Sequence, residues 1–209
     1  MARKENFRKL KSEGTVVVGD GLCEKLYFDQ MKAAEKLTSN IEPKLPKTGS
    51  WSTVFETVDK LLSNEAYSHI YCLIDYDTVI SKNEVQKYLK RKKELEETKR
   101  VTIFECNPCF EMWFLVHYEK TSRHFEHCGS VADYLKKQYI SDYDKTEKYY
   151  QRKSIYKHLD PKQSQAILNA RFLEQNREDN GPKYPRAEVY KLIELLKGIK
   201  DGNLKDAKF

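Results

Sequence analysis

Acidic residues follow two apolar runs of this chain, Thr15–Val18 and His69–Ile74. The acids that follow them are Asp20, Glu24, Asp75 and Asp77. If both runs are parallel strands, their carboxyl ends meet at one edge of a sheet, where ligands bind in this kind of architecture. Neighbouring carboxylates repel one another, and a hard divalent cation such as Mg²⁺ or Mn²⁺ relieves that repulsion. The pattern therefore predicts a metal site formed by Asp20, Asp75 and Asp77.

The spacing of these acids supports that prediction. Asp75 and Asp77 are two residues apart, so in extended geometry their side chains project to the same side. Glu24 comes four residues after Asp20, about one helical turn further on, and we expect it to face the same site. The alternative for Asp75 and Asp77 is a solvated turn that caps a helix.

Strands and helices must alternate to bring the two runs together. The apolar patterns predict strands at 15–18, 69–74 and 101–104, and helices at 24–37, from Ser50 or Ser52 to 62, and 81–97. Short apolar strands separated by helices indicate an α/β fold whose mainly parallel sheet has helices on both faces.

Strand patterns become rare after residue 107. Asn107 is expected to cap, and Pro108 to open, a helix that ends at Tyr118, and further helices are predicted at 130–138, 162–176 and 187–197. We therefore expect a single domain over residues 1–209. Its α/β core is expected to span residues 13–106 and to carry a mostly helical part formed by residues 107–209.

The composition excludes several classes of protein. Of 209 residues, 33% are charged and 39% hydrophobic, and no apolar run is long enough to cross a membrane. The first residues contain no apolar secretion signal, so a cytoplasmic protein without membrane partners is expected. A P-loop is also missing, which argues against ATP hydrolysis by this chain.

The cysteine count points to reduced thiols. The chain has five cysteines, an odd number, and no signal for export. Cys106 and Cys109 have the spacing of a redox pair or half a zinc site. Because no second pair completes a tetrahedral ligand set, a zinc site is not favoured, and a redox role stays open.

An apolar block, "PCFEMWFLVHY", combines hydrophobic side chains with Glu111 near its start. A carboxylate beside so much apolar surface needs a helix N-terminus, a cation or a metal to stay ionised. Glu111 is therefore either stabilised by the helix dipole or a further acid of the site. His117 shares a helical stripe with Phe110, Trp113 and Phe114, which favours a core histidine over a general base.

A basic segment from 145 to 157 lies in a tyrosine-rich stretch. Cations interleaved with aromatic rings are typical of surfaces that bind single-stranded nucleic acid. The residues expected to bind it are Lys145, Lys148, Tyr149, Arg152 and Lys153. The alternative is a solvated helix face with tyrosine anchors.

Two family resemblances follow from these motifs. "DGLCE" and "DYD" resemble the paired acidic motifs of the Toprim domain, with Asp20 where glutamate is usual and Cys23 where a hydroxyl residue is common. Together with "NPCFEMWFLVHY" and "NGPKYPRAEVYKLIELL", in this order, they resemble the RloB family of prokaryotic mobile and defence loci. "NPCFEMWFLVH" is the most specific of these matches.

The resemblance implies a Toprim-like, Rossmann-like fold and Mg²⁺-dependent (or Mn²⁺-dependent) phosphodiester cleavage. Asp75 and Asp77 would hold the metal, and Asp20 would share it, hold a second ion or move a proton. Glu24 and Glu111 would be further catalytic acids. It also implies an ATPase partner of the ABC or AAA type in antiphage defence. By analogy with related effectors, RNA, including tRNA, is favoured over DNA. The alternatives are an inactive Toprim-like subunit that regulates an ATPase, and a nucleotidyl-transfer enzyme.

Overall fold

A five-stranded sheet forms the centre of the computed structural model, which describes residues 14–19, 21–37, 40–41, 50–63, 67–176 and 184–200. The strand order is β2-β1-β3-β4-β5. Its strands are β1 (Gly14–Val18), β2 (Asn40–Ile41), β3 (Tyr67–Asp75), β4 (Val101–Asn107) and β5 (Arg186–Ala187). The pairs between β2, β1, β3 and β4 are parallel, and β5 is antiparallel to β4. The expected mainly parallel sheet is confirmed, and the short strands β2 and β5 were missed.

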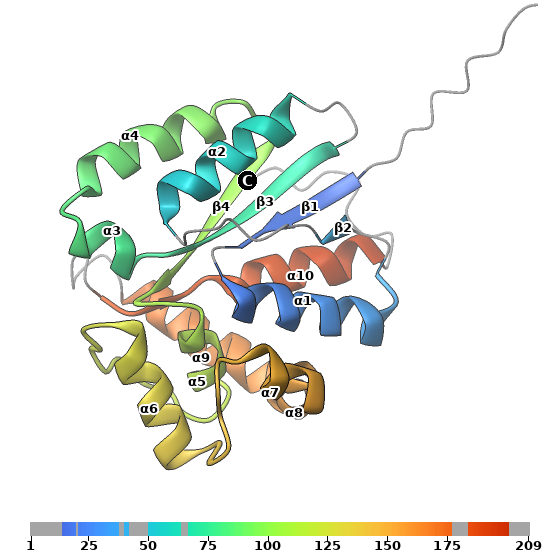
Figure 1. Cartoon of the computed structure of the whole chain (residues 1–209), viewed down its shortest axis with the longest axis vertical. Helices are drawn as coiled ribbons and strands as arrows, with labels where there is room; N and C mark the ends of the chain where they lie inside the picture. The colour runs from blue at the N-terminus through green and yellow to red at the C-terminus, as the bar shows by residue number, and fades with distance from the viewer. Residues whose placement is uncertain are drawn as a thin grey trace, which may run out of the picture.

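Helices cover both faces of this sheet (Figure 1). One face carries α2 (Trp51–Leu62), α3 (Asp77–Ser81) and α4 (Val85–Glu96), and the other carries α1 (Leu22–Glu35) and α10 (Val189–Lys200). The helix predicted at 81–97 is α4, which begins four residues later because α3 ends at Ser81 and a turn follows in which Asn83 has a positive φ of 54°.

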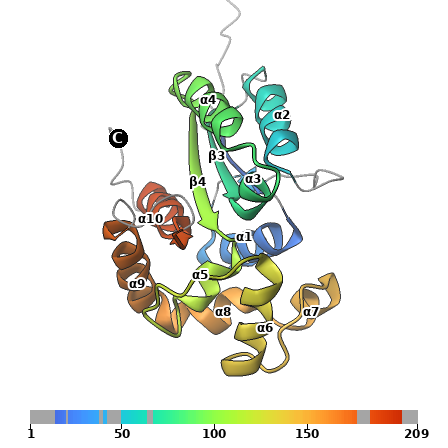
Figure 2. The same ribbon diagram turned by 90° about the vertical axis from the view of Figure 1, so that its left-hand side faces the viewer.

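The remaining helices gather at one end of the sheet, beyond the arrowhead of β4 (Figures 1 and 2). They are α5 (Glu111–Leu115), α6 (Cys128–Gln138), α7 (Glu147–Arg152), α8 (Ile155–Leu159), the 3₁₀ helix η1 (Asp160–Lys162) and α9 (Gln163–Gln175). Among the described segments, no helix has both the length and the apolar character needed to cross a membrane.

Strand β3 is buried on both faces, which explains its almost unbroken apolar sequence. Ile70, Cys72 and Ile74 point into the core beneath α2 and α4. Tyr71 and Leu73 point into the larger core on the opposite face. That larger core contains side chains of α1 and β4 as well as of α5 to α10, so the helical part packs directly on the sheet.

The segment around Asn107 differs from its prediction. Asn107 is the last residue of β4, and its amide Nδ2 donates to the carbonyl of Tyr184 at 2.8 Å instead of capping a helix. A cis peptide bond joins Asn107 to Pro108, and α5 begins only at Glu111. The helix predicted to end at Tyr118 begins late because β4 extends further than its apolar pattern suggests. It ends at Leu115 and is followed by turns.

Candidate functional site

A cavity of about 300 Å³ lies where β3 ends and α1, α3, α5 and α6 begin. It is lined by Gly21, Leu22, Cys23, Glu24, Asp75, Asp77, Thr78, Glu111, Cys128 and Lys145. Its ionisable side chains thus include four carboxylates and one ammonium group. The structure brings together these predicted site residues from distant parts of the sequence. Asp20 lies outside the described residues, although Gly21, the next residue in the chain, lines the cavity.

Asp75 and Asp77 reach this cavity in a way that the sequence did not predict. The strand ends at Asp75, and the intervening Tyr76 is helical (φ −78°, ψ −16°), so the expected extended geometry is wrong. Backbone amides orient both carboxylates: Phe110 N–H donates to Asp75 Oδ1 at 2.8 Å, and Cys128 N–H donates to Asp77 Oδ2 at 3.3 Å. Burial raises the pKa of Asp77 above its ordinary value, despite hydrogen bonds from the amides of Cys128 and Thr78 and despite the charge of Lys145.

Two glycines of the β1–α1 turn make room for Glu24. This side chain is 3% exposed and lies in the first turn of α1. A Cβ on Gly19 would stand 2.8 Å from the Cβ of Glu24, and a Cβ on Gly21 would stand 2.8 Å from its Oε2. At position 19 only glycine allows this close approach, whereas an alanine at position 21 would displace the flexible end of the Glu24 side chain. The Gly-x-Gly turn therefore lets the Glu24 carboxylate fold back over the end of β1.

Glu111 is the most deeply buried carboxylate of the cavity, with 1% exposure. The Tyr143 hydroxyl donates to its Oε1 at 3.0 Å, and the Lys145 ammonium lies 2.6 Å from the same oxygen. Burial would lower the pKa of Lys145, but the charge and hydrogen bond of Glu111 outweigh burial and raise it. Glu111 lies in the first turn of α5, as the helix-dipole explanation requires, and it also lines the cavity, as a further acid of the site would. The structure adds a cation, Lys145, from a loop 34 residues further along the chain.

The predicted nucleic-acid segment is placed differently from expectation. Tyr149 is 3% exposed, so its ring is part of the core and offers no face to a base. Lys153 and Arg152 both contact Asp142, at 2.8 and 3.5 Å. Lys148 is exposed. The interleaving of rings and charges arises because α7 buries its tyrosines and exposes its cations.

A disulfide joins Cys109 to Cys128, so the expectation of reduced thiols is wrong for this pair. Cys106, the partner suggested by the C-x-x-C spacing, is buried and takes no part in the disulfide, and the same holds for Cys23 and Cys72. No local pattern could have identified the pair, because Cys128 follows Cys109 by 19 residues and belongs to a separate helix.

His117 is the core residue that its helical stripe predicted. Its ring is 3% exposed, and Nδ1 lies 2.7 Å from the carbonyl oxygen of Trp113. Burial lowers the pKa of this imidazole to about 4. His117 is absent from the lining of the carboxylate cavity.

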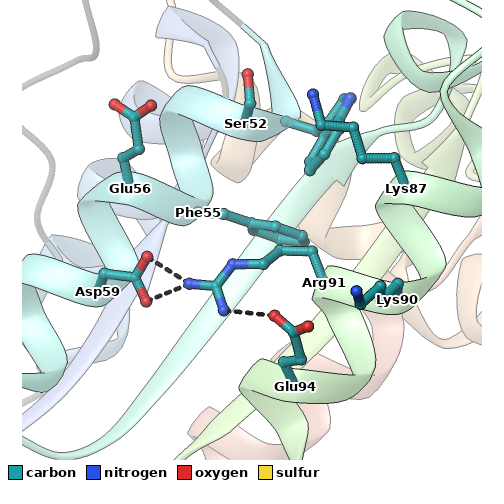
Figure 3. A pocket seen from close by; sticks show the side chains of 9 residues that line it. Ser52, Phe55, Glu56, Asp59, Lys87, Lys90, Arg91 and Glu94 are labelled. Carbon is teal, nitrogen blue, oxygen red and sulfur yellow. Dashed lines mark hydrogen bonds and ion pairs between the residues drawn. The ribbon is translucent and has the colours of Figure 1, made fainter.

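Two other cavities lie outside the carboxylate cavity: one adjoins it, and the other lies elsewhere on the protein. One, of about 270 Å³, shares Asp77 with the carboxylate cavity and is also lined by Asn107, His124 and Phe125. The other, of about 380 Å³, lies between α2 and α4 (Figure 3). There Arg91 binds both Asp59 and Glu94, so these acids are already neutralised by a cation of the protein itself.

The comparisons with known proteins agree with the motifs. A model of the RloB-like protein family matches residues 15–196, and the chain belongs to this family. No curated protein and no solved structure matches the chain.

Proposed function

We propose that this protein is a Mg²⁺-dependent or Mn²⁺-dependent nuclease with a Toprim-like fold that hydrolyses phosphodiester bonds of nucleic acid. One observation carries the proposal: four carboxylates from four different elements line one cavity together with a single lysine. They are Glu24 of α1, Asp75 of β3, Asp77 of α3 and Glu111 of α5. The family provides the context, since the match to its model, over residues 15–196, includes all four of these residues.

The residues of the cavity fit a hard divalent cation. Carboxylate oxygens are the ligands that Mg²⁺ prefers, and Lys145 can neutralise only one of the four negative charges. Asp75 and Asp77, held by backbone amides, would bind the ion, together with Asp20 as the sequence predicts. A bound ion would stabilise negative charge on the phosphate and make water a stronger nucleophile.

The protein's own groups have separate tasks in this proposal. Glu24, whose carboxylate lies close to Gly21, would accept the proton of the attacking water. Lys145 has a side chain that is 46% exposed, so its ammonium can contact a phosphate while it holds Glu111.

Aromatic residues beside the second cavity offer a path for the nucleic-acid strand. Phe125 lines that cavity, and its ring centroid lies 5.6 Å from that of Tyr134. Arg123 lies over the Tyr134 ring at 4.4 Å, and Tyr139 stacks on Tyr118 at 4.7 Å. Of these rings Phe125 lines the cavity itself and is only partly buried, so we propose that it stacks a base in place of Tyr149. Lys148, Arg152 and Lys153 remain proposed phosphate contacts.

The substrate and the partner are proposed from the family alone. RNA, including tRNA, is preferred to DNA, and an ATPase of the ABC or AAA type is the proposed partner in antiphage defence. Neither proposal rests on a contact in this chain.

The test is to incubate the purified chain, with and without its ATPase neighbour, with total RNA and plasmid DNA under Mg²⁺, Mn²⁺ or EDTA. We expect cleavage that EDTA abolishes and that Asp75→Asn and Asp77→Asn each remove. Because both residues serve the same ion, their effects should not add. Glu56→Gln, which changes an acid of the α2–α4 cavity, is the matched control and should cleave normally. No cleavage under any of these conditions would favour an inactive regulatory subunit, whereas lengthened strands would indicate nucleotidyl transfer.

A further inference from the structure

The disulfide at the edge of the carboxylate cavity has an unusual neighbour. Glu111 Oε2 lies 2.9 Å from the Sγ of Cys109 and 2.9 Å from the Sγ of Cys128. A disulfide sulfur carries no hydrogen, and a carboxylate oxygen is only an acceptor, so neither contact is a hydrogen bond while the disulfide is intact. The same atoms become complementary when the sulfurs are thiols or when a cation lies between sulfur and oxygen.

Asp75 completes a compact set of ligand atoms. One of its carboxylate oxygens and the two sulfur atoms all lie within 4.8 Å of one another. With Glu111 the set has two sulfur and two carboxylate ligands. Zn²⁺ takes four such ligands in tetrahedral sites, whereas Mg²⁺ avoids sulfur.

We propose that Cys109 and Cys128 form a redox-controlled site that, when reduced, binds a thiophilic divalent cation such as Zn²⁺ together with Asp75 and Glu111. The oxidised pair leaves only carboxylates, which favour Mg²⁺ or Mn²⁺. The redox state of the pair therefore selects the cation that this centre binds. Cation binding stands on the ligand set alone, while its effect on strand cleavage rests on the proposed function.

The chemistry balances with ordinary thiol reagents. A small dithiol reduces the disulfide, giving two protein thiols and the cyclic disulfide of the reagent. Binding of Zn²⁺ then displaces the two thiol protons into water. Hydrogen peroxide reverses the reduction: two thiols and one peroxide give one disulfide and two waters. Cys128 lines the cavity and is only partly buried, so both reagents can approach the pair there.

Cobalt absorption tests this proposal without any nucleic acid. The full chain is reduced, freed of reductant under argon and titrated with Co²⁺. We expect a sulfur-to-cobalt charge-transfer band that saturates at one equivalent, that Zn²⁺ abolishes, and that is missing from the peroxide-oxidised chain. Cys109→Ser and Cys128→Ser should each weaken the band and lower the affinity for Co²⁺. Cys72→Ala, which changes a buried cysteine of the other core that is not in the disulfide, should retain both.

The comparison of the reduced and oxidised wild-type chain needs no variant, so it decides the question even if a serine variant does not fold. A reduced chain without the band, or a band of equal strength in the oxidised chain, would overturn the proposal. In cleavage assays, Zn²⁺ should inhibit the reduced chain more than the oxidised chain in the presence of Mg²⁺. If no cleavage is found at all, the cobalt result still stands, so failure of the nuclease and failure of this site are separable.

Discussion

Lys145 has two roles: its ammonium lies 2.6 Å from Glu111 Oε1, and it is proposed to contact phosphate. Replacing Lys145 by methionine tests both, the first through stability and the second through cleavage. Methionine keeps much of the apolar stem and removes the charge. Glu111 would keep its hydrogen bond from Tyr143 at 3.0 Å but would lose its cation. We therefore expect the protein without metal to become less stable.

The magnitude follows from the burial of the two partners. Breaking a fully buried ion pair costs about 3–5 kcal/mol, and breaking an exposed pair costs about 0.2–1 kcal/mol. Glu111 is 1% exposed, but the Lys145 side chain is 46% exposed, so solvent screens part of the interaction. We expect the free energy of unfolding to fall by about 2 kcal/mol, between these limits.

Bound Mg²⁺ should offset part of this loss of stability in the Lys145→Met variant. A cation that binds only the folded state stabilises it by about 2.7 kcal/mol at 100 times its dissociation constant. Removing Lys145 takes a competing positive charge out of the cavity, so Mg²⁺ should bind and stabilise the variant more strongly than the wild type. The variant should still cleave poorly, because the phosphate contact is lost.

Urea unfolding with EDTA or with Mg²⁺ measures both effects. Lys148→Met is the matched control, since Lys148 is exposed in the same segment, and its stability should differ from wild type by less than about 0.5 kcal/mol. A Lys145→Met protein as stable as wild type in EDTA would refute the role of Lys145 as the cation for Glu111. Weaker stabilisation by Mg²⁺ in this variant would refute the metal site.

Two further predictions concern the turn and the core. Gly21→Ala should push aside the Glu24 carboxylate and lower the affinity for Mg²⁺, measured by calorimetry. In Gly19→Ala the new methyl group meets the Glu24 Cβ, so this variant should also lose about 1–3 kcal/mol of unfolding free energy, measured in urea. Equal stability losses for the two variants would contradict this assignment. Burial lowers the pKa of His117 from 6.5 to about 4, so the unfolded state binds more protons in this range and stability falls as the pH drops through it. Relative to His117→Asn, the wild type should lose up to about 3 kcal/mol between pH 7 and pH 4, and parallel pH profiles would disprove the linkage.

The sequence predicted a strand or a buried side chain correctly where apolar residues recur regularly along a short stretch. Apolar runs located β1, β3 and β4, because each of these strands is central and needs apolar side chains. The helical stripe of His117 predicted its burial in the same way. By contrast, β2 and β5 have only two residues each, too few to form a pattern.

Part of the site could also be predicted from residues that are close together in the sequence. Acids that follow a strand lie at a known edge of a parallel sheet, so Asp75 and Asp77 were assigned to one cavity even though Asp77 starts a helix. Glu24 was expected to face the site from its spacing of one turn, and the structure adds that Gly19 and Gly21 make its approach possible.

The sequence by itself determined the alternation of strands and helices and the edge at which acids gather, since each is encoded in residues close together along the chain. It also determined the family, through several short motifs in a fixed order. Only the tertiary structure decided that Lys145 neutralises Glu111, that Cys109 pairs with Cys128, and that Tyr149 is buried. The physical reason is that the first two contacts join segments whose separation in the chain carries no periodic signal. Burial of a tyrosine, likewise, depends on which helices pack against it, which no short stretch of sequence specifies.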